Sequence, residues 1–146
     1  CYNIGTINGT KTQDARVGGI LSEGFGGKVT ACYNTGTLQG SPRGNIVGRV
    51  FSYASSFGIS TCYWKGSDNA VGANDDNRAN ISGGGAINGT DWAAAMSAMN
   101  SALESEGVGY RYELNTDEAT KTFEPLKLKL ISGNGNLGDY GNNGSI

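Results

Sequence analysis

The stretch Cys32–Leu38 reads CYNTGTL, and it is the middle copy of a short repeat. The same pattern stands at Cys1–Ile7 as CYNIGTI and returns in altered form at Cys62–Gly66 as CYWKG. The copies begin 31 and then 30 residues apart, within the range of about 20–50 residues that marks stacked repeat architectures. The period therefore predicts a fold of stacked repeats, with one or two coils in each period.

Apolar, strand-like segments recur between the cysteines. Gly18–Leu21 (GGIL) precedes the second copy and Gly44–Gly48 (GNIVG) precedes the third, while Val29 and Ile59 each lie three residues before a cysteine. Short β-branched runs separated by Gly, Ser and Asn are typical of strands and turns, and strands repeated along one chain can stack on one another. The sequence thus predicts a short parallel β-solenoid. Its expected interior ladders join Ile20 with Ile46 or Val47, Val29 with Ile59, and the three cysteines with one another.

The cysteines are expected to be reduced residues of the core, because a free thiol is small and prefers burial. Their odd number, the lack of a CxxC pair and the lack of any histidine argue against zinc, so neither a metal nor a cofactor is expected. The tyrosine after each cysteine should point to the opposite side of its strand. These tyrosines either cover turns or form an external aromatic column. Possible ligand-stacking residues are Tyr33, Tyr63 and Trp64.

The segments Gly18–Leu21 and Gly27–Gly40 together resemble the GLUG repeat, whose pattern runs GG-[LI]-[VL]-G and then G-x-[IV]-x-x-CYNTG-x-V. Ser22 stands where that family usually has Gly, and Trp64-Lys65 replaces Asn-Thr in the third copy. This variant is similar to the last coil of such arrays. The likeness covers about residues 1–72. It implies a large secreted or surface-anchored bacterial protein, often adhesin-like; some relatives are proteases of immunoglobulin A, in which the array is not the catalytic domain.

After the third copy the pattern gives way to a polar run, Asn74–Arg78. This run is expected to be a surface loop that leaves the solenoid. Its carboxylates, with Asp68, offer calcium ligands, but their order fits neither an EF-hand nor the glycine-rich nonapeptide. A solvated loop is the favoured interpretation.

A helix and two strands are predicted further along the chain. Apolar residues with helical spacing are Trp92, Met96, Met99 and Leu103. Thr90 or Asp91 is the expected N-cap and Gly107 the expected stop. Alternation in Tyr110–Leu114 (YRYEL) and Leu126–Leu130 (LKLKL) predicts two strands with one buried face. We call this helix and strand pair the closing unit, because it resembles the segment that closes such arrays and is expected to cover an open end of the stack.

Composition excludes several functional classes. Eleven basic and 13 acidic residues give a net charge of −2, so no strong field attracts nucleic acid or an anionic bilayer. No apolar run approaches the ~18 residues of a membrane span. Without histidine, a Ser/His or Cys/His nucleophile is excluded, and the carboxylates are too scattered to suggest a glycosidase pair. No enzymatic activity is expected.

The resulting hypothesis has three segments: solenoid repeats at 1–72, a loop and the closing unit at 73–131, and a Gly/Asn-rich tail or linker at 132–146. The chain starts within a repeat and lacks an initiating Met, so further repeats of a parent chain are expected before Cys1. The expected role is a non-enzymatic structural or adhesive segment outside the cell or on its surface. The alternative is a carbohydrate-binding or polysaccharide-acting accessory module. Expected partners are surface glycans or proteins of a host or of microbes.

Overall fold

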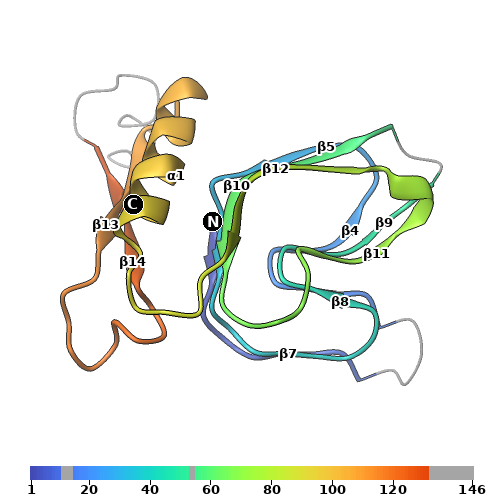
Figure 1. The fold of residues 1–146 in the computed structure, drawn as a ribbon, viewed down its shortest axis with the longest axis horizontal. Helices are drawn as coiled ribbons and strands as arrows, with labels where there is room; N and C mark the ends of the chain where they lie inside the picture. Colours follow the sequence, from blue (N-terminus) through green and yellow to red (C-terminus); the bar gives the residue numbers. More distant parts are fainter. Residues whose placement is uncertain (11–14, 53–54, 132–146) are drawn as a thin grey trace, which may run out of the picture.

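The repeats form successive coils of a stack of short parallel strands, seen along its axis in Figure 1. The computed structural model describes residues 1–10, 15–52 and 55–131; the predicted tail at 132–146 lies outside this range. The strands of the first coil are β1 (Tyr2–Asn3), β2 (Ile7–Asn8), β3 (Val17–Gly18), β4 (Leu21–Gly24) and β5 (Gly27–Thr30). The second coil consists of β6 (Tyr33–Asn34), β7 (Leu38–Gln39), β8 (Arg43–Gly44), β9 (Val47–Val50) and the first half of β10 (Phe57–Trp64).

The third coil uses the second half of β10, β11 (Val71–Asn74), the 3-10 turn η1 (Asp75–Asn77) and β12 (Ala79–Ala86). Because β11 pairs with β9 and β12 pairs with β10 from Phe57↔Ala79 to Trp64↔Ala86, the stack continues well past residue 72. The predicted boundary at 72 is therefore wrong, as is the predicted departure of Asn74–Arg78 from the solenoid. Parallel pairing needs backbone groups in register and does not need a repeated side-chain motif. The strand β12 therefore stacks on β10 although it has Gly83–Gly85 where the earlier coils have the Cys-Tyr motif.

The register confirms one coil in each period and the predicted ladder of Val29 with Ile59. Tyr2 pairs with Tyr33 and Tyr33 with Tyr63, and the Ile20 amide donates to the Ile46 carbonyl at 3.0 Å. The interior of the coils is filled by a buried cluster of Val29, Cys32, Ile46, Val47, Val50, Phe57, Ile59, Cys62, Ala70 and Val71.

The cysteine ladder is only partly interior. Cys32 and Cys62 are buried, whereas Cys1 is exposed, since no described coil lies on its far side. The opposite end of the stack is also open: no described strand pairs with the outer edge of β12, and Ile81, which continues the Val29–Ile59 ladder, is 54% exposed.

Close backbone contacts explain why glycine recurs in the GGIL and GNIVG segments. A Cβ on Gly18 would lie 1.7 Å from the Leu21 carbonyl oxygen, and one on Gly44 would lie 2.1 Å from that of Val47. Both glycines stand where the coil folds inward and β3 and β8 approach the next strands (Figure 1). No larger residue fits this close backbone approach.

The closing unit consists of α1 (Ala93–Ser105), β13 (Tyr110–Leu114) and β14 (Leu126–Leu130). Asp91 Oδ1 accepts the Ala93 amide at 3.1 Å at the start of α1, and Gly107, with φ of 69°, follows its end. The two strands pair antiparallel, from Tyr110↔Leu130 to Leu114↔Leu126. The predicted helix and strand pair are thus confirmed, although of the apolar face Tyr112 and Leu126 are buried while Tyr110, Leu114 and Leu130 remain exposed.

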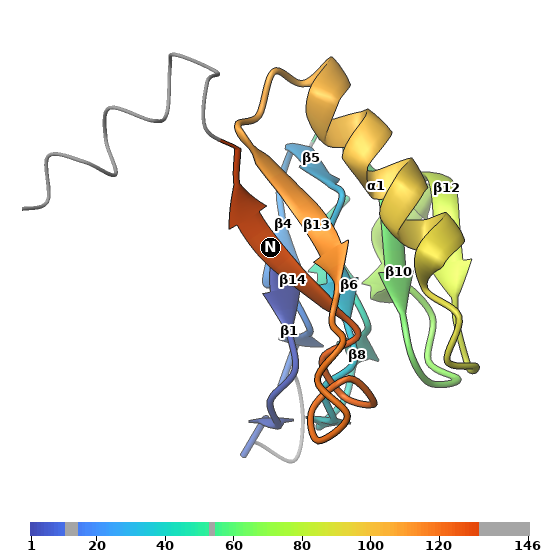
Figure 2. The same ribbon diagram turned by 90° about the vertical axis from the view of Figure 1, so that its left-hand side faces the viewer.

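The closing unit packs beside the stack, against the outer face of the β1-β6-β10 sheet (Figures 1 and 2). The expectation that it covers an end of the stack is wrong, because the apolar surface that it buries is the outward tyrosine row. The shared core consists of Ala31, Tyr33, Trp92, Ala95, Met99, Leu103, Tyr112 and Leu126.

Candidate functional site

The tyrosine row lies outside the coils, as predicted, but its central member is not accessible. Tyr33 is 0% exposed. Its ring stacks on Tyr2 with centroids 4.9 Å apart and planes at 1°, and its edge meets Tyr112 at 5.8 Å. The proposal of Tyr33 as a ligand-stacking residue is therefore wrong, because the closing unit covers it.

The other two proposed stacking residues do not form a surface with Tyr33. Tyr63 is half-buried and packs at the edge of the shared core. Trp64 is also half-buried, but it packs against the interior cluster of the coils. Since Tyr63 and Trp64 pack against different cores, they do not make the continuous aromatic face on which a sugar ring stacks.

Burial changes the ionisation of the tyrosine row. Burial raises the pKa of Tyr33 above its ordinary value of 10.0, and burial likewise raises that of Tyr112. The pKa of Tyr2 is raised first by the hydrogen bond from its hydroxyl to Glu124 Oε1, at 2.8 Å. Phenol groups of this kind stay neutral and act as hydrogen-bond donors at physiological pH.

The buried thiol of Cys62 is also held in its protonated form. Cys62 Sγ donates to the Ser60 carbonyl at 3.4 Å, and Cys32 Sγ donates to the Thr30 carbonyl at 3.4 Å. The side-chain hydrogen bond between the two thiols, followed by burial, raises the pKa of Cys62, and the same hydrogen bond lowers the pKa of Cys32 to about 6. Because Cys32 and Cys62 are both buried, they offer packing and no thiolate that a substrate could reach.

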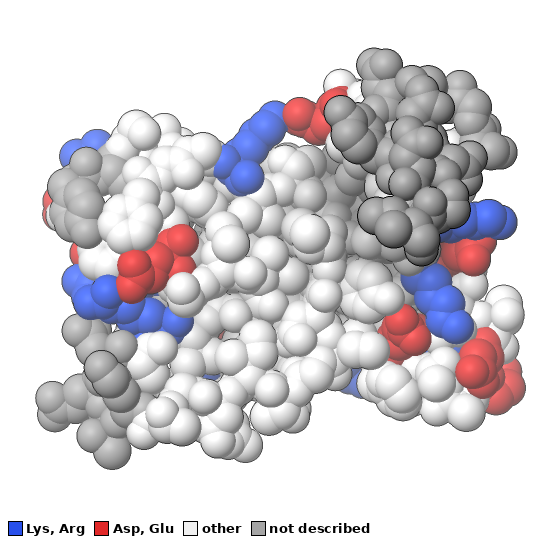
Figure 3. Space-filling view, turned by 180° about the vertical axis from the view of Figure 1, so that it is seen from behind, with Lys and Arg blue, Asp and Glu red and all other residues white. Residues whose placement is uncertain are grey.

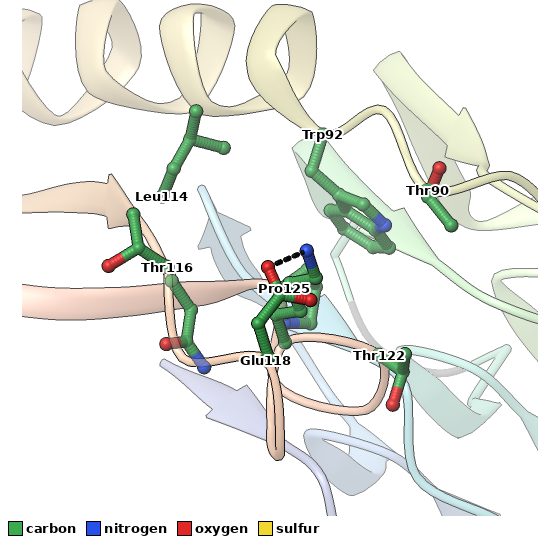
Figure 4. Close-up of a pocket in the computed structure, with 9 residues that line it drawn as sticks. Thr90, Trp92, Leu114, Thr116, Glu118, Thr122 and Pro125 are labelled. Atoms are coloured by element: carbon green, nitrogen blue, oxygen red, sulfur yellow. Dashed lines mark hydrogen bonds and ion pairs between the residues drawn. The ribbon is translucent and has the colours of Figure 1, made fainter.

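A pocket of about 370 Å³ with a mixed polar and apolar lining lies between the start of α1 and the connection from β13 to β14 (Figure 4). Thr90 and Trp92, which precede α1, line one part of the pocket. The connection between the two strands and its flanking residues line the rest: Leu114, Thr116, Glu118, Thr122 and Pro125. Two of the lining residues form an ion pair, Lys121 Nζ with Glu118 Oε1 at 2.6 Å. Trp92 is only 3% exposed, so its ring supports the pocket and offers little area to a ligand.

The buried amide of Asn115 shapes the connection that lines this pocket. Its Nδ2 donates to Thr120 Oγ1 at 2.9 Å and to the Glu124 carbonyl at 2.7 Å, and its Oδ1 accepts the Asp117 amide at 3.0 Å. With this amide satisfied, threonine hydroxyls and the Glu118–Lys121 pair are the groups left to meet a small polar molecule. This pocket could not be predicted from the sequence, because its lining combines residues up to 35 positions apart without a motif.

A second depression, of about 320 Å³, lies beside β7. A chain of side-chain amides leads to it: Asn3 Nδ2 donates to Asn34 Oδ1 at 2.9 Å, and Asn34 Nδ2 donates to Asn45 Oδ1 at 3.0 Å. Asn45 Nδ2 then donates to the Asp68 carbonyl at 2.6 Å. These amides explain the asparagine of the CYN motif, which the sequence analysis left without a role.

Charged side chains form pairs and do not gather by sign. Asp68 pairs with Arg43 at 2.8 Å and Asp75 with Arg49 at 3.0 Å, so two of the carboxylates considered for calcium face separate arginines. Among the described residues, no group of three His, Cys, Asp or Glu is placed to hold a metal ion. On the face seen in Figure 3, charges of both signs lie toward the margins, with a broad band free of them between.

Comparisons of this chain with protein-family models, with curated proteins and with solved structures give no match. Within the described part of the chain, no helix has the length and apolarity that crossing a bilayer requires.

Proposed function

We propose that this chain is a stiff structural segment of a large secreted or surface-anchored bacterial protein related to the GLUG-repeat, adhesin-like polypeptides. The proposal rests on the repeat motifs and on one contact in particular. The Tyr112 hydroxyl, in the closing unit, donates to the Ala31 carbonyl at 2.8 Å and lies 3.0 Å from the Cys1 carbonyl. One side chain thereby connects two successive coils to the closing unit.

Two features support mechanical stiffness. Backbone hydrogen bonds between coils run along the stack axis, so bending the stack strains many of them together. The closing unit adds contacts to both of the first two coils, since Tyr2 Oη donates to Glu124 and Tyr33 Oη donates to the Leu126 carbonyl. A segment of this kind holds the domains on either side of it at a fixed separation.

Single-molecule stretching of the whole chain between its ends tests this role. We expect one cooperative unfolding event that releases the stack and the closing unit together, at about 3.5 Å per residue. Tyr112→Phe should lower the unfolding force, and Tyr110→Phe, which changes an exposed hydroxyl of the same strand, should not. Stepwise release of single coils at low force would contradict the proposal.

The pocket of Figure 4 favours a second candidate, binding of a carbohydrate. Threonine hydroxyls and an ion pair are groups that hydrogen-bond sugar hydroxyls. A glycan array with the intact chain, followed by Thr116→Val and Glu118→Gln, tests it. Both substitutions should reduce a glycan signal that the exposed-surface control Thr6→Val preserves. The absence of any signal from the parent chain would reject this candidate.

A further inference from the structure

The depression beside β7 exists because the third coil is shorter than the second. The second coil takes twelve residues from Asn34 to Ile46, whereas the third takes six from Trp64 to Ala70, the positions that stack on them. The third coil therefore has no strand above β7. On its other side β7 pairs with β2, and no described strand covers its remaining edge.

The uncovered edge presents backbone hydrogen-bonding groups. The carbonyls of Thr37 and Gln39 accept the amides of Ile7 at 2.8 Å and Gly9 at 2.7 Å, both in the first coil. Along a parallel strand, successive residues direct their groups to opposite neighbours. The N–H and C=O of Leu38 therefore face the depression, where a longer third coil would have paired with them.

The wall of the depression is held in place by several hydrogen bonds. Arg43 Nε donates to Asp68 Oδ2 at 2.8 Å, Asn45 Nδ2 donates to the Asp68 carbonyl at 2.6 Å, and the Gly66 amide donates to Asn88 Oδ1 at 3.2 Å. These bonds fix the turn from Lys65 to Asn69 on three sides. The depression is thus a preformed feature of the stack, which lowers the entropic cost of occupying it.

Lys65 decides the charge of the site. Its side chain is exposed at the rim, and none of the described carboxylates forms an ion pair with it. The other cation of the lining, Arg43, is already paired with Asp68. The depression consequently has one uncompensated positive charge next to an open strand edge.

We propose that this depression binds an extended peptide segment with an acidic side chain, which adds a short strand to β7 and places its carboxylate at Lys65. Strand addition to an open sheet edge takes affinity from main-chain hydrogen bonds and specificity from neighbouring side chains. The bound segment occupies the space of the six residues by which the third coil is shorter. This binding goes beyond the proposed structural role, which concerns stiffness and needs no ligand.

The test uses the full chain and a fluorescein-labelled seven-residue peptide of alternating threonine and glutamate, followed by fluorescence anisotropy. We expect saturable binding below about 1 mM and at least a fivefold weaker affinity when glutamine replaces glutamate. Lys65→Glu should weaken binding about tenfold, because it places like charges together. The matched control Lys129→Glu, which changes the net charge equally on β14, should stay within twofold of the parent.

Two further peptides test strand addition without altering the protein. Each is N-methylated at alternate residues, one at the odd positions and the other at the even positions. N-methylation should abolish binding, since it removes the donors that meet the β7 edge. Unchanged affinity of the N-methylated peptides would overturn the proposal, as would equal effects of Lys65→Glu and Lys129→Glu. Absence of binding at 1 mM would overturn the proposal too. So would an equal affinity for tetragalacturonate, an acidic oligosaccharide that has carboxylates but no peptide backbone. Circular dichroism of each variant verifies that the stack is intact.

Discussion

The hydroxyl of Tyr33 donates a 2.5 Å hydrogen bond to the backbone carbonyl of Leu126, and both residues are fully buried. Tyr33 belongs to the motif of the second coil and Leu126 begins the last strand of the closing unit. Along the chain they are 93 residues apart. The bond therefore attaches the closing unit to the centre of the repeat motif, and it gives the outward tyrosine a structural role.

Removing this bond should destabilise the protein. Tyr33→Phe keeps the ring stack but leaves the Leu126 carbonyl buried without its donor, which costs about 1–3 kcal/mol. Urea unfolding followed by circular dichroism measures the change in the free energy of unfolding. Tyr110→Phe removes an exposed hydroxyl and should alter that free energy by less than about 0.5 kcal/mol. Equal stabilities of the two variants would show that the bond contributes nothing.

Stability should fall at alkaline pH. Burial raises the pKa of Tyr33 and Tyr112 in the folded protein above 10.0, whereas in the unfolded chain these phenols ionise near 10. Their contribution is complete below pH 10 and is lost as the pH rises above it, because only the unfolded state then releases the protons. Between these pKa values each group lowers the free energy of unfolding by about 1.4 kcal/mol per pH unit.

Urea titrations at several pH values from 8 to 11.5, with absorbance at 295 nm, measure this dependence. Tyr33→Phe should make the alkaline slope shallower, and Tyr110→Phe should leave it unchanged. Native protein that ionises all of its tyrosines near pH 10 without unfolding would contradict the expectation.

Two methionines of α1 differ in burial, which allows their contributions to stability to be compared. Met99 is fully buried, whereas Met96 lies half-buried at the margin of the shared core. Met99→Ala should lower the free energy of unfolding by about 2–5 kcal/mol, through lost contacts and a cavity. Met96→Ala should cost clearly less, since its site is open to solvent on one side. Thermal melts of both variants decide the point, and Met99→Asp should be worse than Met99→Ala because it buries a charge. Equal melting temperatures of the parent and Met99→Ala would mean that α1 is not packed on the stack.

The period of the cysteines predicted the stack because each period brings equivalent backbone groups into register. The pairing of Val29 with Ile59, the helix around Met99 and the strand pair starting at Tyr110 followed from periodicity in the same way. In each case the signal lies within a short window of sequence or repeats at a fixed distance.

The burial of Tyr33 has no comparable local signal. The alternation of the strand gives its direction, outward from the coil, but its cover comes from residues about 60–93 positions downstream. The pairing of β12 with β10 could not be predicted for a different reason. Gly83–Gly85 pairs with β10 through its backbone alone, and glycine carries no side-chain pattern that could reveal the register.

Alanine substitutions at two neighbouring glycines of β12, Gly83 and Gly84, should have different effects. Ala31, Thr61 and Gly83 stack at one corner of successive coils, with φ of 53°, 53° and 64°. Alanine already adopts this left-handed conformation at position 31, and a Cβ on Gly83 would meet no atom closer than 3.5 Å. Gly83→Ala should therefore cost only the backbone strain of this conformation, about 1–2 kcal/mol. At Gly84, with φ of 85°, a Cβ would lie 2.0 Å from the Cys62 carbonyl oxygen. Gly84→Ala must therefore displace β12 from β10.

Amide hydrogen exchange distinguishes these outcomes, because it reports the pairing of β12 separately from global stability. In Gly84→Ala, protection should be lost along Ala79–Ala86 while the amides of β6 and β9 keep theirs. In Gly83→Ala, protection of β12 should resemble that of the parent. If both variants exchanged alike, the corner would not impose the same backbone conformation on its three coils, and the stack would end at β10 in solution.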